Sequence, residues 1–129
     1  MPNSADALRT LLTRRIAILD GGMGTVLQQH HLQEEDFRGD RFADHASLLG
    51  GNNDLLCLTQ PGIIRDVHTA YFAAGADIVE TNTFNATTLS QAEYGLDDAD
   101  FIRELNVAAA RLARSAADDA AQDGQQRWV

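Results

Sequence analysis

Short apolar runs alternate with amphipathic stretches along most of this chain. Residues 16–19, 54–58 and 76–79 are largely apolar runs, bounded by polar or glycine residues. Such runs are typical of strands that helices cover on both faces. We therefore expect three strands, the third continuing into residues 80–84. Residues 127–129 (RWV), which end in two apolar side chains, predict the start of a fourth strand.

Helical periodicity fills the intervals between these runs. Pro61 opens a predicted helix, and Gly75 has the residue type that ends one. Ser4 is the predicted N-cap of a helix over residues 5–15. Further helices are predicted over residues 23–29, 89–94 and 98–121, whereas residues 32–53 are polar and predict a long loop.

The alternation of strands and helices predicts βαβ units and a parallel sheet. Right-handed crossovers then leave two α/β folds open, a doubly wound sheet or a (β/α)8 barrel. The chain of 129 residues holds three predicted βα units and the start of a fourth strand. A closed barrel needs about 250 residues. We therefore interpret the chain as the N-terminal piece of a larger protein.

Composition and charge exclude several classes of protein. Ten arginines and no lysine stand against nineteen acidic residues, for a net charge of −9, which argues against nucleic-acid binding. No apolar run approaches the roughly 18 residues of a membrane helix. One cysteine cannot form an internal disulfide and suits a reducing cytoplasm. The first 15 residues lack the apolar core of a signal peptide, and a mitochondrial leader is the weaker alternative for them.

A glycine-rich stretch, residues 20–25, follows the first predicted strand. It lacks the lysine of a phosphate-binding P-loop and the third glycine of the dinucleotide fingerprint. Glycines allow close approach of the backbone to a ligand, a helix N-terminus favours a carboxylate, and Asp20 favours an ammonium group. These features suit the two charged ends of an amino acid. A tight turn with a capping aspartate is the structural alternative.

Polar residues also replace the apolar run at the end of the third predicted strand. Ligands of parallel α/β proteins bind at the carboxyl ends of strands, which makes residues 80–84 site candidates. Alternation places Thr81 and Thr83 on one face and Glu80 and Asn82 on the other, and leaves open which face lines a pocket. Ordinary turn chemistry is the alternative.

No metal site is predicted from the cysteine and the histidines. Cys57 lies between leucines and is interpreted as a small buried hydrophobe. The histidines at positions 30, 31, 45 and 68 lack the spacing of a ligand pair, and His68 is expected to be partly exposed on its helix.

Four stretches together carry a family resemblance. Residues 18–25 (ILDGGMGT) and 70–85 (AYFAAGADIVETNTFN) resemble homocysteine S-methyltransferases in general. Residues 37–42 (FRGDRF) and 51–56 (GNNDLL) resemble the cobalamin-dependent methionine synthases more specifically. The resemblance implies that residues 16–129 are the first part of a homocysteine-binding (β/α)8 TIM barrel, with residues 1–15 as an N-terminal capping helix.

The resemblance also implies a function in methionine biosynthesis. A methyltransferase of this kind moves a methyl group from methylcobalamin, and ultimately from methyltetrahydrofolate, to homocysteine activated by zinc. The zinc and cobalamin sites are expected outside this chain, whose partners would be homocysteine and the folate and cobalamin modules of the same polypeptide. The isolated fragment is expected to be inactive. Alternatives are a stand-alone homocysteine S-methyltransferase that uses betaine or S-methylmethionine, and a non-catalytic barrel fragment.

Homocysteine-binding roles transfer to positions that match the family motifs. Asp20 matches the acid that holds the substrate ammonium group, and Gly21 and Gly22 match the backbone that approaches it. The polar end of the third predicted strand matches the same pocket through Thr81, Asn82 and Thr83. Glu80 is a weaker candidate. No catalytic residue and no metal ligand is assigned within the chain.

Overall fold

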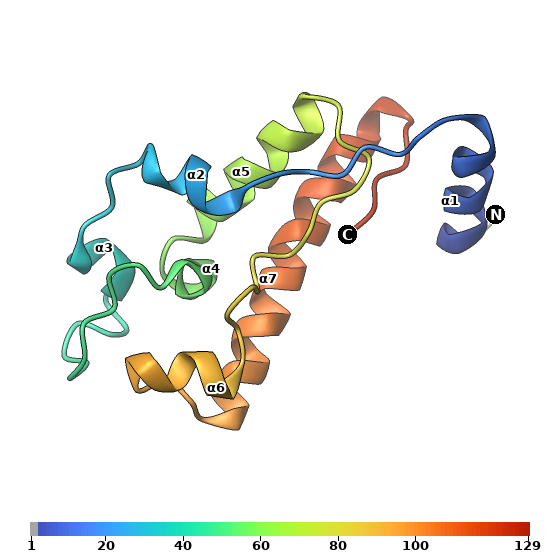
Figure 1. The fold of residues 1–129 in the computed structure, drawn as a ribbon. Helices are drawn as coiled ribbons and strands as arrows, with labels where there is room; N and C mark the ends of the chain where they lie inside the picture. The colour runs from blue at the N-terminus through green and yellow to red at the C-terminus, as the bar shows by residue number, and fades with distance from the viewer. Residues whose placement is uncertain (1–2) are drawn as a thin grey trace.

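The structure is a computed structural model that describes residues 3–129, and it consists mainly of helices joined by extended segments (Figure 1). The α-helices are α1 (Ser4–Arg14), α2 (Met23–Gln28), α3 (Glu34–Arg38), α4 (Leu56–Thr59), α5 (Pro61–Ala73), α6 (Thr88–Gln91) and α7 (Ala99–Ala120). Short 3-10 turns lie at η1 (Asn53–Leu55), η2 (Ala92–Tyr94) and η3 (Ala121–Asp123). None of these described helices is long and apolar enough to cross a membrane.

Three extended segments lie parallel to one another and take the place of a regular sheet. Isolated bridges join Leu19 to Ile78 and Ile78 to Trp128, so the segment around Ile78 is in the middle. The Asp20 amide donates to the Ile78 carbonyl at 3.0 Å, and the Val79 amide donates to the Trp128 carbonyl at 3.1 Å. The segments therefore follow one another in space in the same order as in the sequence.

The prediction of a strand at residues 54–58 is wrong. This stretch forms η1 and α4, and Leu55, Leu56 and Cys57 are all buried. A short apolar run has no period long enough to distinguish a strand from a helical turn that is buried all round. The chain consequently holds two helix-containing crossovers between three extended segments, rather than three βα units and the start of a fourth strand.

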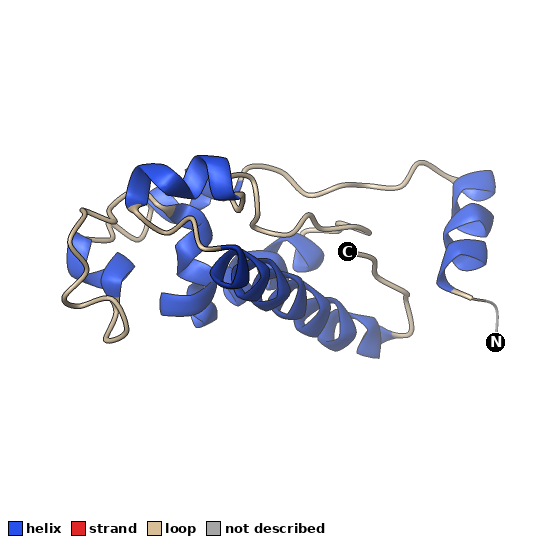
Figure 2. Cartoon of the chain, turned by 90° about the horizontal axis from the view of Figure 1, so that it is seen from below, coloured by secondary structure: helices blue, strands red, loops and turns tan. Residues whose placement is uncertain are grey.

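Helices α5 and α7 pack against each other on one face of the extended segments (Figure 2). Both core clusters include residues of these two helices, and the larger one also takes in residues of α2, α3 and α4. Gly75, with φ of +111°, follows α5, and the amides of Gly75 and Ala76 donate to the carbonyls of Phe72 and Tyr71. This is a Schellman cap, as the glycine predicted. Asp98 caps α7 by accepting from the Phe101 amide. The predicted helices over residues 61–74 and 98–121 are thus confirmed.

One prediction about this core is wrong. His68 on α5 is fully buried rather than partly exposed, and neither of its ring nitrogens has a hydrogen-bond partner among the described residues. Burial lowers the pKa of His68, because the charged imidazolium would lose its hydration. The histidine therefore acts as a neutral, space-filling part of the α5 face.

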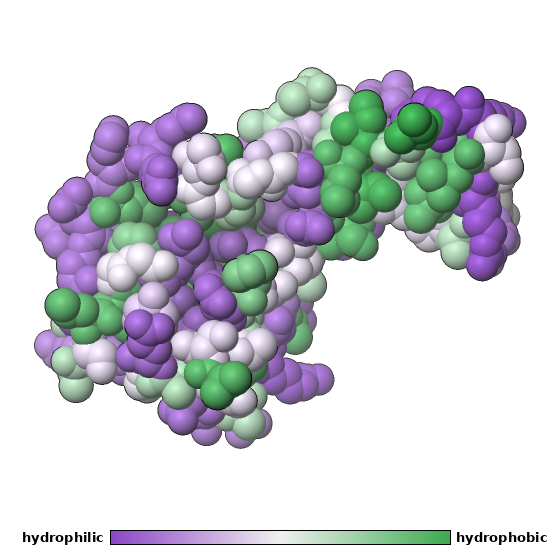
Figure 3. Space-filling model, viewed as in Figure 1, coloured by the Kyte–Doolittle hydropathy of each residue, from purple (hydrophilic) through white to green (hydrophobic). Residues whose placement is uncertain are grey.

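Helix α1 stands apart from the other helices, at the amino ends of the extended segments (Figure 1). Its N-cap is Asn3, which accepts from the Asp6 amide, rather than the predicted Ser4. The Trp128 indole donates to the Ser4 carbonyl at 3.1 Å and ties the helix to the third extended segment. Figure 3 shows apolar surface in the region between α1 and the larger body.

Candidate functional site

A cavity of about 380 Å³ lies at the carboxyl ends of the first two extended segments. It brings together every residue that the sequence predicts for the site, namely Asp20, Gly21, Gly22, Thr81, Asn82 and Thr83. The weaker candidate Glu80 also lines it. Parallel strands point their carboxyl ends to one edge, which explains why residues sixty positions apart meet here.

Asp20 is the acidic group of this cavity. Its Oδ2 accepts from the Glu80 amide at 3.1 Å, which ties the first extended segment to the second. Its Oδ1 is buried and has no partner among the described residues. Burial raises the pKa of Asp20, since the carboxylate is partly desolvated, and the Glu80 amide only partly opposes this. The free oxygen is therefore an acceptor for a cationic donor.

The glycine loop after Asp20 is held in place by Tyr71 of α5. The Tyr71 hydroxyl donates to the Gly22 carbonyl at 2.7 Å. A Cβ atom at Gly21 would lie 3.2 Å from the same hydroxyl, so any side chain there would push against the tyrosine. Gly21 and Gly22 thus keep the cavity wall thin and let a ligand reach the backbone.

The polar residues at the end of the second extended segment have two different roles. Thr81 Oγ1 and Thr83 Oγ1 lie 2.7 Å apart in a hydrogen bond, which uses one of their two hydroxyl hydrogens and leaves the other. Asn82 is buried, and its Nδ2 donates to the Asn53 carbonyl at 2.9 Å. The threonines are therefore available to a ligand, whereas the asparagine amide braces the cavity wall.

A third side of the cavity comes from residues that the sequence pattern does not indicate as part of the site. Gly51, Asn53 and Asp54 line it from the loop and turn before α4, and Asn85 lines it from beyond Thr83. Asp54 is buried and accepts from the Asn85 amide at 2.9 Å. The family resemblance of residues 51–56 is the signal that could have placed Gly51, Asn53 and Asp54 at the site.

The residues present do not fit a zinc ion. No group of three or more histidine, cysteine or acidic side chains gathers in the part of the chain that the structure describes. Cys57 is buried as expected, and burial raises the pKa of its thiol to about 12. It therefore remains protonated, and a protonated thiol is a poor metal ligand.

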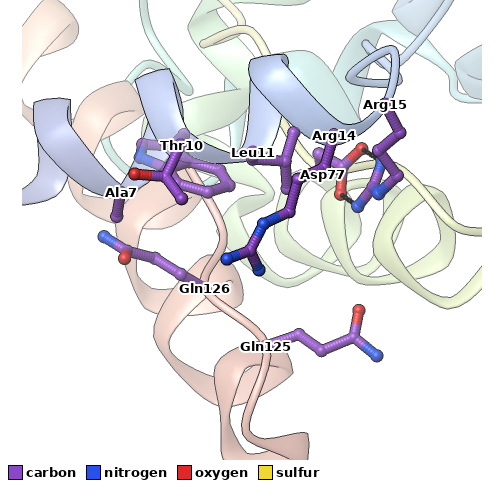
Figure 4. Close-up of a pocket in the computed structure, with 9 residues that line it drawn as sticks. Ala7, Thr10, Leu11, Arg14, Arg15, Asp77, Gln125 and Gln126 are labelled. Carbon is purple, nitrogen blue, oxygen red and sulfur yellow. Dashed lines mark hydrogen bonds and ion pairs between the residues drawn. The ribbon is translucent and has the colours of Figure 1, made fainter.

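A second, larger cavity of about 540 Å³ is lined by α1 and by residues of the segment 125–128 (Figure 4). Its acidic residue, Asp77, is already paired with Arg15 at 2.6 Å. It lies at the amino ends of the extended segments, opposite the edge where ligands of parallel α/β proteins bind. We therefore place the candidate site at the Asp20 cavity.

Comparison with known proteins identifies the family. A family model described as homocysteine S-methyltransferase matches residues 17–129. The chain belongs to this family. Homocysteine S-methyltransferases among the solved structures include the homocysteine methyltransferase MmuM from Escherichia coli, in an oxidized form (TM-score 0.69) and a metallated form (TM-score 0.68). Both are 28% identical to this chain, cover 91% of it, and are matched over 36% of their own length. The chain thus spans about a third of these relatives.

Proposed function

We propose that this chain supplies the part of a homocysteine S-methyltransferase that binds the amino-acid end of homocysteine. The observation that carries the proposal is the buried, unpartnered Oδ1 of Asp20 in a cavity lined by glycines and hydroxyls. A buried acceptor without a partner is costly, and an ammonium group would supply the missing donor. Family membership then makes homocysteine the first amino acid to test.

Each wall of the cavity has a part in this binding. Asp20 receives the substrate ammonium group, and the remaining hydroxyl hydrogen of the Thr81–Thr83 pair donates to the substrate carboxylate. Gly21 and Gly22 allow the backbone to approach. This arrangement orients the substrate by its amino-acid end and leaves its sulfur free to meet groups from elsewhere in the protein. The described residues contribute no metal ligand, so sulfur activation is assigned to no residue here.

For the methyl donor, we propose methylcobalamin, as in the cobalamin-dependent methionine synthases. The support comes from residues 37–42 and 51–56, whose resemblance is specific to those enzymes. Of these two stretches, the second contributes Gly51 and Asn53 to the cavity lining. In the first, Arg38 donates to the carbonyls of His45 and Ser47, in the loop that precedes Gly51.

A stand-alone enzyme with a small methyl donor is the second candidate, because membership of the homocysteine S-methyltransferase family does not fix the methyl donor. The two candidates separate in one assay of the whole protein that carries this chain. Methionine formation from methyltetrahydrofolate with cobalamin supports the first, whereas formation from S-methylmethionine or betaine without cobalamin supports the second. A protein that forms no methionine from any of these donors contradicts both.

Replacing Asp20 tests the binding role directly. In the whole protein, Asp20→Asn is expected to weaken homocysteine binding by about ten- to a hundredfold. The reason is the loss of one charge-assisted hydrogen bond, which is worth about 1.5–3 kcal/mol. Isothermal titration calorimetry measures the affinity. Asp66→Asn removes the same charge from an exposed position on α5 and serves as the control. Equal affinity of wild type and Asp20→Asn would exclude the assignment.

The same role predicts how binding depends on pH. The homocysteine ammonium group binds the ionised form of Asp20. The affinity for homocysteine is therefore highest above the pKa of Asp20 and decreases as the pH falls through that pKa. Because burial raises this pKa, the loss begins at a higher pH than for an ordinary aspartate. Titrations over a pH series are expected to show this fall in wild type and a flatter profile in Asp20→Asn. Parallel profiles in the two proteins would contradict the prediction.

A further inference from the structure

A group of buried polar side chains lies directly behind the candidate site. Asn52, Asp54, Asn82 and Gln91 are exposed by only 2%, 3%, 6% and 0%. Each has a hydrogen-bond partner, and together they join the turn η1 to the segment 82–85 and to α6. Buried polar groups of this kind seldom improve stability over apolar packing, but a fully bonded network specifies one arrangement of the backbone.

The network holds Asn85 by both of its backbone groups. Asp54 Oδ2 accepts from the Asn85 amide at 2.9 Å, and Gln91 Nε2 donates to the Asn85 carbonyl at 3.1 Å. Gln91 is fixed in turn by a reciprocal pair of bonds with Asn52, at 2.8 and 3.0 Å. The end of the segment that carries the threonines is therefore fastened from two sides.

Asp54 is the member of this network that also lines the cavity next to Asp20. A second bond runs beside it in the same direction, from Asn82 Nδ2 to the Asn53 carbonyl at 2.9 Å. These two bonds cross from η1 to the residues on either side of Thr83. They set how far the threonine hydroxyls stand from the rest of the cavity.

We propose that Asp54 is a positioning residue that fixes the segment 81–85 and thereby sets the affinity of the site for the carboxylate end of its amino-acid substrate. The inference rests on the proposed homocysteine site. Asp54 acts through the Asn85 amide and not by receiving the substrate ammonium group, which is the role of Asp20. The two aspartates thus serve opposite ends of the same ligand.

Two ligands and two kinds of variant separate these roles in the whole protein. The ligands are L-homocysteine and 4-sulfanylbutanoic acid, which is homocysteine without its amino group. Asp54→Ala is expected to weaken both ligands by about tenfold or more, the size of one lost charge-assisted hydrogen bond. Asp20→Asn is expected to weaken only homocysteine. Asp54→Asn keeps an acceptor oxygen in place and is expected to stay within about threefold of wild type, because a neutral hydrogen bond replaces the charged one.

Controls distinguish positioning from general loss of stability. Val67→Ala removes buried apolar atoms from α5, outside the cavity lining, and is expected to lower the melting temperature without changing either affinity. If Asp54→Ala does not fold, Asp54→Ser replaces it, since the shorter hydroxyl group is too far away to accept from Asn85. Wild-type affinity in a folded Asp54→Ala or Asp54→Ser variant, or equal losses in Asp54→Asn and Asp54→Ala, would overturn the proposal. Failure of wild type to bind homocysteine would instead contradict the proposed function.

Discussion

An isolated polypeptide of residues 1–129 is expected to be helical in far-ultraviolet circular dichroism but to show no sharp cooperative melt. Ile16, Ile18, Leu19 and Val129 are exposed by 86%, 53%, 51% and 45%, and all lie in or beside the extended segments. At about 25 cal/mol per Å², some 400 Å² of apolar surface left in water forgoes roughly 10 kcal/mol. A whole domain is stable by only about 5–15 kcal/mol.

The unpaired edges of the extended segments add to this deficit. Leu19 and Trp128 each bridge to Ile78 on one side, and no other extended segment among the described residues bridges to their other edges. Open edges and apolar surface together favour self-association. Size-exclusion chromatography and binding of a hydrophobic dye are expected to show aggregation or a loosely packed state. A monomer with one steep thermal transition and dispersed NMR signals would contradict the prediction.

The sequence predicts α5 and the start of α7 accurately because these helix ends have strong local signals. Pro61 and Gly75 bracket α5, and Asp98 caps α7, so local chemistry alone fixes these boundaries. The buried run at 54–58 has no such signal and packs on all sides, so only tertiary structure distinguishes a strand from a turn. His68 was misjudged for a related reason, since its burial depends on how α5 meets its neighbours.

The candidate site was partly predictable because its residues share one topological position. Asp20 and Thr81 each follow a parallel extended segment, and the carboxyl ends of such segments meet at one edge. Asp54 follows no strand and enters through a 3-10 turn, so the rule that found the others could not find it. The Thr81–Thr83 pair and Asn82 have different roles because their side chains have different hydrogen-bond partners. Alternation along a strand predicts which face a side chain is on, but not which group it contacts.

At the opposite edge, Asp77→Ala is expected to lower the free energy of unfolding of the whole protein by about 2–3 kcal/mol. The Asp77 carboxylate is 5% exposed and accepts from Arg15 at 2.6 and 2.7 Å and from the Ile18 amide at 2.8 Å. Breaking a buried ion pair costs about 3–5 kcal/mol. The Arg15 side chain is 45% exposed and regains water when released, so the expected loss is smaller. Denaturant titration measures it, with Asp118→Ala as the control, because that variant breaks only the exposed pair with Arg114.

The same contact makes a prediction for acid stability. Hydrogen bonds from Arg15 hold the pKa of Asp77 below its ordinary value of 3.8, so the folded state binds this proton less readily than the unfolded chain does. The stability that Asp77 contributes is therefore complete above about pH 4 and is lost as the pH falls through the folded pKa. Wild type is expected to lose more stability than Asp77→Ala between about pH 4 and the acid transition. Equal losses in both proteins would show that the Asp77–Arg15 pair contributes no pH-dependent stability.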